Sequence, residues 1–355
     1  MVGTGFFFFK WSENMSIDRI DKNTLKEYGR LQGVVECAIL YKERKTNKEI
    51  GEILKIAPPT VTRYIQKALE EGIIRIEVHP PDATEVAKEI KHKYDLKEVH
   101  VFPIGIANEV RNMLARLAAY YLENLLDEKK ENITRIAIGP GKTTLALVRA
   151  LTGKKRTDMK VLSASSPSPR ETYMASNILI GIPAGKWECD LSRFDPDMPL
   201  RQQEDYADIL FFGIGKIPDV DGVTALAILN EPRHKPKIDN RAITNEMNNL
   251  STDGAVGFIN YQPIDKQGKP FDWEWKGYKN TFYEESQSIK SGLKSTLLNL
   301  NIIRRIARKP DKRVVCIAGG KDRLDAIKAS LKGKYFNVLI TDLETAKDLL
   351  GKEDE

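Results

Sequence analysis

Six short apolar runs alternate with helical runs between residues 99 and 350, and this alternation constrains the fold more than any other feature of the sequence. Strands alternating with helices predict a largely parallel sheet covered on both faces, because each parallel connection needs a crossover. The stretch 216–310 is irregular and rich in Asn, Pro and Lys, and its pattern assigns no elements. The predicted strands are 99–104, 133–139, 159–165, 208–215, 313–320 and 336–342, and the predicted helices are 108–126, 142–151, 321–332 and 343–350.

Short helices are predicted before this α/β region. Apolar residues at helical spacing predict one helix over 25–42. Thr46 followed by Glu49 has the spacing of a capping box, which opens a second helix. The pair Pro58-Pro59 is tolerated only in a first helical turn, so a third helix is expected over 58–71, ended by Gly72.

The predicted domain boundary follows these helices. A short strand is expected at 73–78, and Pro80-Pro81 then breaks the chain. We therefore expect a disordered extension at 1–20, a DNA-binding domain at 21–80 and an effector-binding domain at 81–355.

Two short helices joined by a tight turn form the unit that places its second helix in the major groove of DNA. The whole chain carries a net charge of +6, and residues 42–67 contribute +4 of it, which is the local charge that phosphate binding needs. The alternative is a small helical bundle whose lysines are merely solvated. The residues expected to contact DNA are Thr46, Lys48, Pro59, Thr60, Thr62, Arg63, Gln66 and Lys67.

Three glycine turns follow predicted strands in the second domain: GPGKTT (139–144), GIGK (213–216) and AGGKD (318–322). Ligands of open parallel sheets bind at the carboxyl ends of the strands, where helix starts present amides to anions. Each turn also carries a lysine, so a site for a phosphorylated or carboxylated small molecule is expected. The alternative is that the glycines only fit tight turns. An ATPase loop is not expected, because Ile136 stands where that motif requires glycine.

Other classes of protein are disfavoured by composition. Four histidines without metal-ligand spacing predict no metal site, and no cofactor is expected. The three cysteines, odd in number and far apart, are typical of a reducing compartment. No apolar run approaches the roughly 18 residues of a membrane span, and the first residues lack the features of a signal peptide. A cytoplasmic protein is expected.

Several segments resemble the SorC-type bacterial transcription regulators. They are PTVTRYIQKALEEGIIRIEV (59–78), LKEVHVFP (96–103), GKT (141–143), GIG (213–215), GAVGFI (254–259) with a following D-x-x-G-x-P, and CIAGGKDRLDAIKASLKGKYFNVLITDLETAKDLL (316–350). The resemblance covers about residues 28–351. It implies a winged helix-turn-helix followed by a Rossmann-like, doubly wound effector domain similar to sugar-phosphate isomerases. It also implies a dimer or tetramer that binds operator DNA of a catabolic operon and responds to a phosphorylated sugar.

Carried over by position, the resemblance assigns effector contacts to the three glycine turns and to one residue of GAVGFI. Phe258 stands where relatives commonly have an aspartate that bonds sugar hydroxyls, and Ser163-Ala164-Ser165-Ser166 replaces an Asn-Gly-Gly-type loop. In the third helix, Pro58 replaces a polar or basic residue, and Lys55 replaces the usual turn glycine. The implied effector contacts are Gly139, Gly141, Lys142, Thr143, Gly213, Gly215, Lys216, Phe258, Gly319, Gly320 and Lys321.

The leading hypothesis is therefore a regulator without enzymatic activity or catalytic residues. A sugar-phosphate isomerase or deaminase is the alternative from another class, with Asp221, Asp253 and Glu246 as candidate acids and bases. A regulator that has lost its effector is the third hypothesis, because Phe258 and the serine loop alter the expected site.

Overall fold

The computed structural model describes residues 22–74, 83–104, 109–128, 132–165, 175–195, 197–217, 250–270, 273–275, 278–280 and 298–351. The chain divides into two compact units, Met1–His79 and Pro80–Glu355. The expected extension at 1–20, most of the expected strand at 73–78 and the Pro80-Pro81 pair lie outside the described residues.

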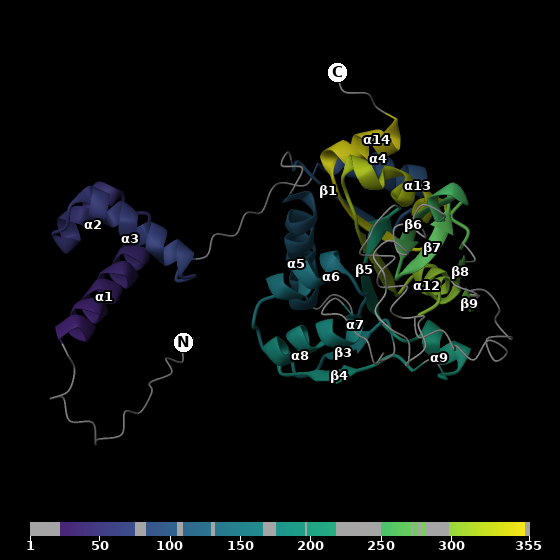
Figure 1. Cartoon of the computed structure of the whole chain (residues 1–355), viewed down its shortest axis with the longest axis horizontal. Helices are drawn as coiled ribbons and strands as arrows, with labels where there is room; N and C mark the ends of the chain where they lie inside the picture. Colours follow the sequence, from purple (N-terminus) through teal and green to yellow (C-terminus); the bar gives the residue numbers. More distant parts are fainter. Residues whose placement is uncertain are drawn as a thin grey trace. The chain divides into compact units, whose positions relative to one another are not determined.

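The first unit contains three helices, α1 (Lys22–Lys42), α2 (Asn47–Leu54) and α3 (Pro58–Glu70) (Figure 1). These helices confirm the predicted spans to within a few residues. A small core joins them, because Cys37 of α1, Ile50 of α2 and Val61 of α3 are all fully buried in one cluster.

The turn between α2 and α3 depends on three local features. The capping box is present, since the Thr46 amide donates to Glu49 Oε2 at 2.7 Å and the Glu49 amide donates to Thr46 Oγ1 at 3.3 Å. Lys55 ends α2 in the left-handed region, with φ of 54°. A Cβ on Gly51 would lie 2.7 Å from the Ile56 carbonyl oxygen, so only glycine lets the turn fold back this closely.

A seven-stranded parallel run forms the centre of the second unit, in the order β1-β11-β10-β5-β2-β3-β4. The predicted parallel sheet is thus confirmed, and β4 is an edge strand that the sequence pattern did not assign. The chain moves outward through β2, β3 and β4 and then returns to place β5 on the other side of β2. The strands are β1 (Glu98–Phe102), β2 (Arg135–Ile138), β3 (Lys160–Ser163), β4 (Asp190–Ser192), β5 (Ile209–Lys216), β10 (Arg313–Ile317) and β11 (Val338–Asp342).

Helices cover both faces of this sheet. One buried cluster includes α5 (Val110–Glu128), α6 (Lys142–Ala150), α7 (Ser176–Leu179) and α8 (Gly181–Trp187). The cluster on the other face includes α4 (Thr84–Tyr94), α12 (Leu300–Ala307), α13 (Leu324–Lys332) and α14 (Leu343–Leu350). A short helix, α9 (Leu200–Glu204), packs against α12. Among the described helices, none has the length and apolar character needed to cross a membrane.

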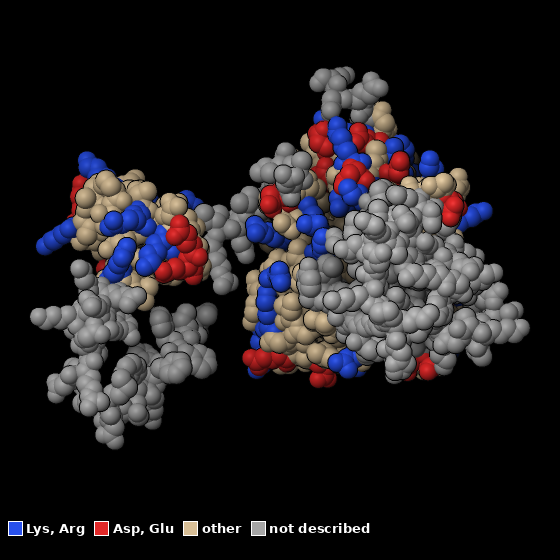
Figure 2. Space-filling model, in the orientation of Figure 1, with Lys and Arg blue, Asp and Glu red and all other residues tan. Residues whose placement is uncertain are grey.

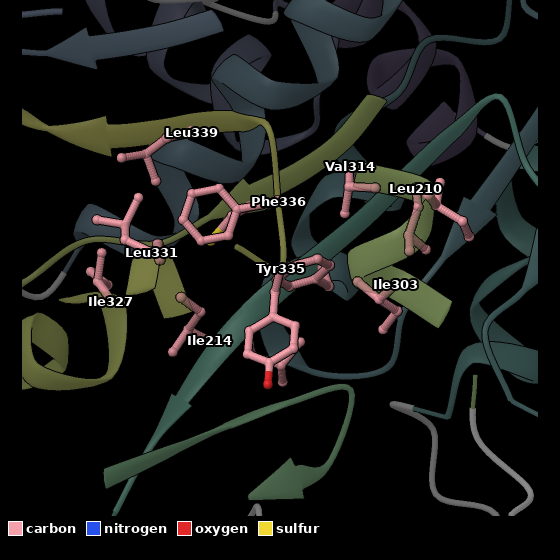
Figure 3. Packing of buried hydrophobic residues seen from close by; sticks show 14 of the residues in the cluster. Leu210, Ile214, Ile303, Val314, Ile327, Leu331, Tyr335, Phe336 and Leu339 are labelled. Atoms are coloured by element: carbon pink, nitrogen blue, oxygen red, sulfur yellow. The ribbon is translucent and has the colours of Figure 1, made fainter. Parts of the chain in front are cut away.

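An aromatic pair lies at the centre of the second cluster. Phe336 packs against Phe212 with ring centroids 6.3 Å apart, and Tyr335 is fully buried (Figure 3). The Tyr335 hydroxyl donates to the carbonyl oxygen of Gly268 at 2.6 Å. A Cβ on Gly268, whose φ is 73°, would lie 2.5 Å from the Gly333 amide nitrogen, which accounts structurally for the glycine of the D-x-x-G motif.

Regular elements are also present in the region 216–310, which the sequence pattern left unassigned. Strands β6 (Ala255–Ile259) and β7 (Gln262–Asp265) form a hairpin that pairs antiparallel with the end of β5. Its two turn residues, Asn260 and Tyr261, have φ of 48° and 60°. That conformation is unusual for a bulky residue such as tyrosine, so the sequence carries none of the usual hairpin signals. Strands β8 (Trp273–Trp275) and β9 (Tyr278–Asn280) form a separate pair.

Ionic clusters hold the strands together at their amino ends. Arg313 of β10 lies 2.8 Å from Glu98 of β1, across the intervening strand β11, and the Tyr121 hydroxyl donates to Glu98 at 2.8 Å. Burial by itself would raise the pKa of Glu98. The His100 ring 3.7 Å away, the hydrogen bond from Tyr121 and the Arg313 guanidinium outweigh that effect and lower the pKa to about 2.

This cluster predicts a pH-dependent contribution to stability. Because the folded pKa lies below the unfolded value of about 4.3, Glu98 stabilises the fold fully above about pH 5 and loses this effect as the pH falls towards about 2. We expect Glu98→Gln to lower the free energy of unfolding by about 1–3 kcal/mol at pH 7. Denaturant unfolding from pH 7 to pH 3 should show the difference shrinking. Glu85→Gln, at an exposed pair with Lys88, is the control, and an equal pH trend in both variants would contradict the prediction.

Candidate nucleic-acid interface and effector site

The solvent face of α3 presents the residues expected to read DNA. Val61, Ile65 and Ala68 bury one face of the helix, which leaves Arg63 and Gln66 exposed on the other. Figure 2 shows Lys and Arg side chains gathered on the visible surface of this unit. Pro59 and Lys48 are exposed as well, and Thr60 is half-buried.

Two of the expected DNA contacts have internal roles. The Thr62 hydroxyl accepts a hydrogen bond from Asn47 Nδ2 at 3.0 Å and donates to the Pro58 carbonyl oxygen at 3.2 Å. Thr46 belongs to the capping box of α2. Thr62 therefore ties the start of α2 to the start of α3, and Asn47 is a contributor that the sequence pattern did not single out.

Weak contacts orient the remaining basic and amide side chains of α3. The Arg63 guanidinium lies 5.9 Å from the centre of the Tyr64 ring. Gln66 Nε2 donates to Glu70 at 3.3 Å, and Lys67 lies 3.4 Å from Glu71. These exposed i,i+4 pairs are worth a few tenths of a kcal/mol at most (~0.3–0.5), so a DNA phosphate or base can displace them.

The first two glycine turns meet at the carboxyl edge of the sheet, where the order of the strands reverses between β2 and β5. The Gly139 amide donates to the Phe211 carbonyl oxygen at 2.8 Å. A Cβ on Gly213 would lie 2.9 Å from both Cβ and Oγ1 of Thr143. Gly213 thus lets the start of α6 pack directly on β5.

The start of α6 is suited to receive an anion. Gly141 occupies the N-cap position with φ of 122° and ψ of 173°, and no side chain caps the helix. Lys142, the first helical residue, is exposed. Unsatisfied amides at a helix start carry partial positive charge, and a phosphate or carboxylate is their usual ligand.

The third glycine turn is already satisfied by protein groups. The Gly320 amide donates to Asp342 Oδ2 at 2.9 Å and to Thr345 Oγ1 at 2.8 Å. Gly319 packs so closely on Asp342 and Leu114 that it has no room for a side chain. Lys321 is exposed in the short 3₁₀ turn that precedes α13.

Lys216 is separated from the first two turns. Side chains alternate along a strand, so Gly213 and Gly215 share one face of β5 and Lys216 lies on the other. The Lys216 ammonium lies 2.8 Å from Asp322, which Arg323 also contacts at 3.0 Å. Burial by itself would raise the pKa of Asp322, but the two cations outweigh burial and lower it.

Of the departures from the resemblance, Phe258 and the serines at 163 and 165 are buried. Phe258 is 3% exposed and lies beside Gly215, its partner across the β5–β6 pair. The Ser163 hydroxyl lies 2.7 Å from Asn177 Oδ1, and the Ser165 hydroxyl lies 2.6 Å from that of Ser176. These two serines therefore bond to Ser176 and Asn177 inside the protein.

The candidate acids and bases of the enzyme hypothesis are not brought together among the described residues. Asp253 is exposed in the turn before β6, while Asp221 and Glu246 lie outside the described part of the chain. Within that part, no cluster of three or more metal-ligating side chains occurs.

Comparison with known proteins agrees with this two-part architecture. Residues 37–75 match the winged helix-turn-helix DNA-binding family, and residues 78–194 and 303–351 match the sugar-binding domain family Sugar-bind. The deoxyribonucleoside regulator of Bacillus subtilis is 24% identical over 340 residues, covering 89% of this chain and 96% of that protein. The transcriptional regulator LsrR of Escherichia coli is 25% identical over 329 residues, covering 87% of this chain and 91% of its own.

Solved structures share the same fold. The full-length sorbitol operon regulator SorC from Klebsiella pneumoniae superposes with a TM-score of 0.56 at 20% identity, covering 90% of this chain and 98% of that one. A helix-turn-helix joined to a sugar-binding α/β domain defines a class of transcriptional regulators. Within that class, the chain is similar in fold to the SorC regulator.

The internal role of Thr62 generates a prediction about stability. We expect Thr62→Val and Asn47→Ala each to lower the free energy of unfolding of the helix-turn-helix unit by about 0.5–1.5 kcal/mol. A double-mutant cycle by denaturant unfolding should give a coupling of about 0.5–1 kcal/mol, because both changes remove the same hydrogen bond. Thr60→Val, which removes no such bond, should change stability by less than about 0.5 kcal/mol. Strict additivity of the first two changes would contradict this role.

Proposed function

We propose that this regulator binds operator DNA of a catabolic operon through α3 and that a phosphorylated sugar modulates this binding. The main support for a phosphorylated effector is the start of α6. This helix start lacks a side-chain cap and lies beside β5, where the order of the strands reverses. The sugar-binding family match supports a sugar, and the helix start favours one that bears a phosphate.

DNA recognition is assigned to the exposed face of α3. Arg63 can form a forked pair with guanine, and Gln66 can pair with adenine in the major groove. Lys48 and Lys67 contribute charge to phosphates, and Thr60 and Pro59 lie at the end of the helix that enters the groove first. Thr46 and Thr62 support this surface from within the turn, because their hydroxyls bond to protein groups there.

A homo-oligomer follows from the same proposal. Two recognition helices related by a two-fold axis read half-sites about 34 Å apart, so the operator should contain an inverted repeat. The effector acts by binding with unequal affinity to the DNA-competent and DNA-incompetent states.

Selective DNA binding is tested with sequences that the full chain enriches from a random duplex library. In gel shifts at fixed salt, we expect Arg63→Ala to weaken binding to the enriched sequence by about 1–3 kcal/mol and binding to random DNA much less. Lys48→Ala should weaken both to the same extent and reduce the salt slope by about one. Failure to enrich any sequence would overturn the proposal. Equal losses on both DNAs in Arg63→Ala would remove Arg63 from base recognition.

The effector is tested with matched pairs of sugars with and without phosphate, such as ribose 5-phosphate and ribose. A ligand that binds only the folded state raises the melting temperature, so at least one phosphorylated member should stabilise the full chain more than its parent sugar. Lys142→Ala should reduce that stabilisation, and Lys321→Ala, in the turn whose amide is already satisfied, should not. No preference for phosphorylated sugars in any pair would favour a regulator without such an effector.

A further inference from the structure

Arg111, on the first turn of α5, is a half-buried arginine that has no ion-pair partner among the described residues. Its Nε is fully buried and makes no hydrogen bond, and no described residue forms an ion pair with its guanidinium. Arg156 and Arg304 also contain a buried Nε without a partner, but their other nitrogens bond to Asp127 and Tyr335. Desolvating a charge without an opposing group is unfavourable, so Arg111 calls for an anion.

The position of Arg111 in α5 places it on the inward face of the helix. Residues three, four and seven positions along a helix share a face, and Leu114, Ala115 and Ala118 are all buried at 1% exposure or less. A Cβ on Gly319 would lie 2.9 Å from Leu114 Cδ1, so this face of α5 packs on the end of β10. Arg111 lies one turn closer to the helix start than Leu114.

The first turn of α5, which holds Arg111, lies at the carboxyl edge of the sheet. Helices that follow parallel strands run back across the sheet, so α5 and α6 both begin at this edge. The two helices pack side by side (Figure 1). Side chains of a helix tilt towards its start, which directs Arg111 away from the core and past the ends of the strands.

We infer that Arg111 is a phosphate-binding residue that receives the anionic group of the effector together with the start of α6. This inference rests on the proposed function and names a contact that none of the three glycine turns contains. A guanidinium provides forked donors that match two phosphate oxygens, and the α6 amides supply donors from a second direction. The third glycine turn is not expected to bind this phosphate, because its Gly320 amide already donates to Asp342 and Thr345.

The test uses inorganic phosphate as the probe and the full chain. Melting temperature is measured against phosphate concentration at constant ionic strength, with chloride as the replacement anion. We expect phosphate to stabilise the wild type, and Arg111→Gln to raise the half-saturating phosphate concentration about tenfold or more. Arg116→Gln is the matched control, because Arg116 is exposed on the same helix and should retain the response of the wild type.

A second readout separates binding from a structural role. Without phosphate, Arg111→Gln should melt at or above the temperature of the wild type, because it removes a charge that no described residue pairs with. A lower melting temperature without phosphate, together with an unchanged phosphate response, would assign Arg111 to structure and overturn the inference. Equal stabilisation by acetate would also overturn it.

Failure of this inference is distinguishable from failure of the proposed function. Selective DNA binding in the absence of ligand should be the same in Arg111→Gln and in the wild type, because the change does not touch the helix-turn-helix unit. Loss of the phosphate response with retained selective binding supports the role of Arg111. A wild type that responds to phosphate but selects no DNA sequence would overturn the regulator proposal and leave the anion site standing.

Discussion

The arrangement of the sugar-binding domain depends on how β5 is fixed between β2 and β10. Asp208, directly before β5, accepts hydrogen bonds from Arg135 at 2.8 Å and from Lys312 at 2.8 Å. Burial by itself would raise the pKa of Asp208, but these cations and two backbone amides outweigh it and lower the pKa well below its usual value. One carboxylate thus sets the register of three strands at their amino ends. The same register brings Gly139, Gly213 and Gly319 to one edge at the opposite ends of those strands.

Electrostatics distinguish turns that look alike in sequence. All three glycine turns carry a lysine, yet Lys216 is paired with Asp322 and the amide of Gly320 is bonded to Asp342. Among the described residues, the turn at Gly141 leads directly into a nine-residue helix whose start has no side-chain cap. A helix start without a side-chain cap and a guanidinium that no described residue pairs with then occur at one edge of the sheet, on adjacent helices. Their combination identifies a candidate anion site more sharply than any glycine pattern does.

Much of the fold was predictable because its signals are local. The capping box at Thr46, the proline start of α3 and the apolar strands are read from neighbouring residues, and all of them are confirmed. The hairpin of β6 and β7 was not predictable, because Asn260 and Tyr261 form a turn that tyrosine seldom adopts. Asn260 is held there by donating to the carbonyl oxygens of Ala164 and Leu298, which are distant in sequence. Residue type suggested that Thr62 contacts DNA, whereas its hydrogen bond to Asn47, fifteen positions away, depends on the angle between two helices.

The sequence by itself determined the two-part architecture and the parallel sheet. Periodicity, caps and glycine turns suffice for these because each is a relation between residues close in the chain. Only the tertiary structure decided which polar groups are already satisfied and which are not. Arg111 lies beside an apolar helical stripe, and sequence spacing gives no sign that its Nε is buried without a hydrogen bond. Hydrogen bonds and desolvation are set by atoms that meet in space, so the binding groups become recognisable only once the strands and helices are packed.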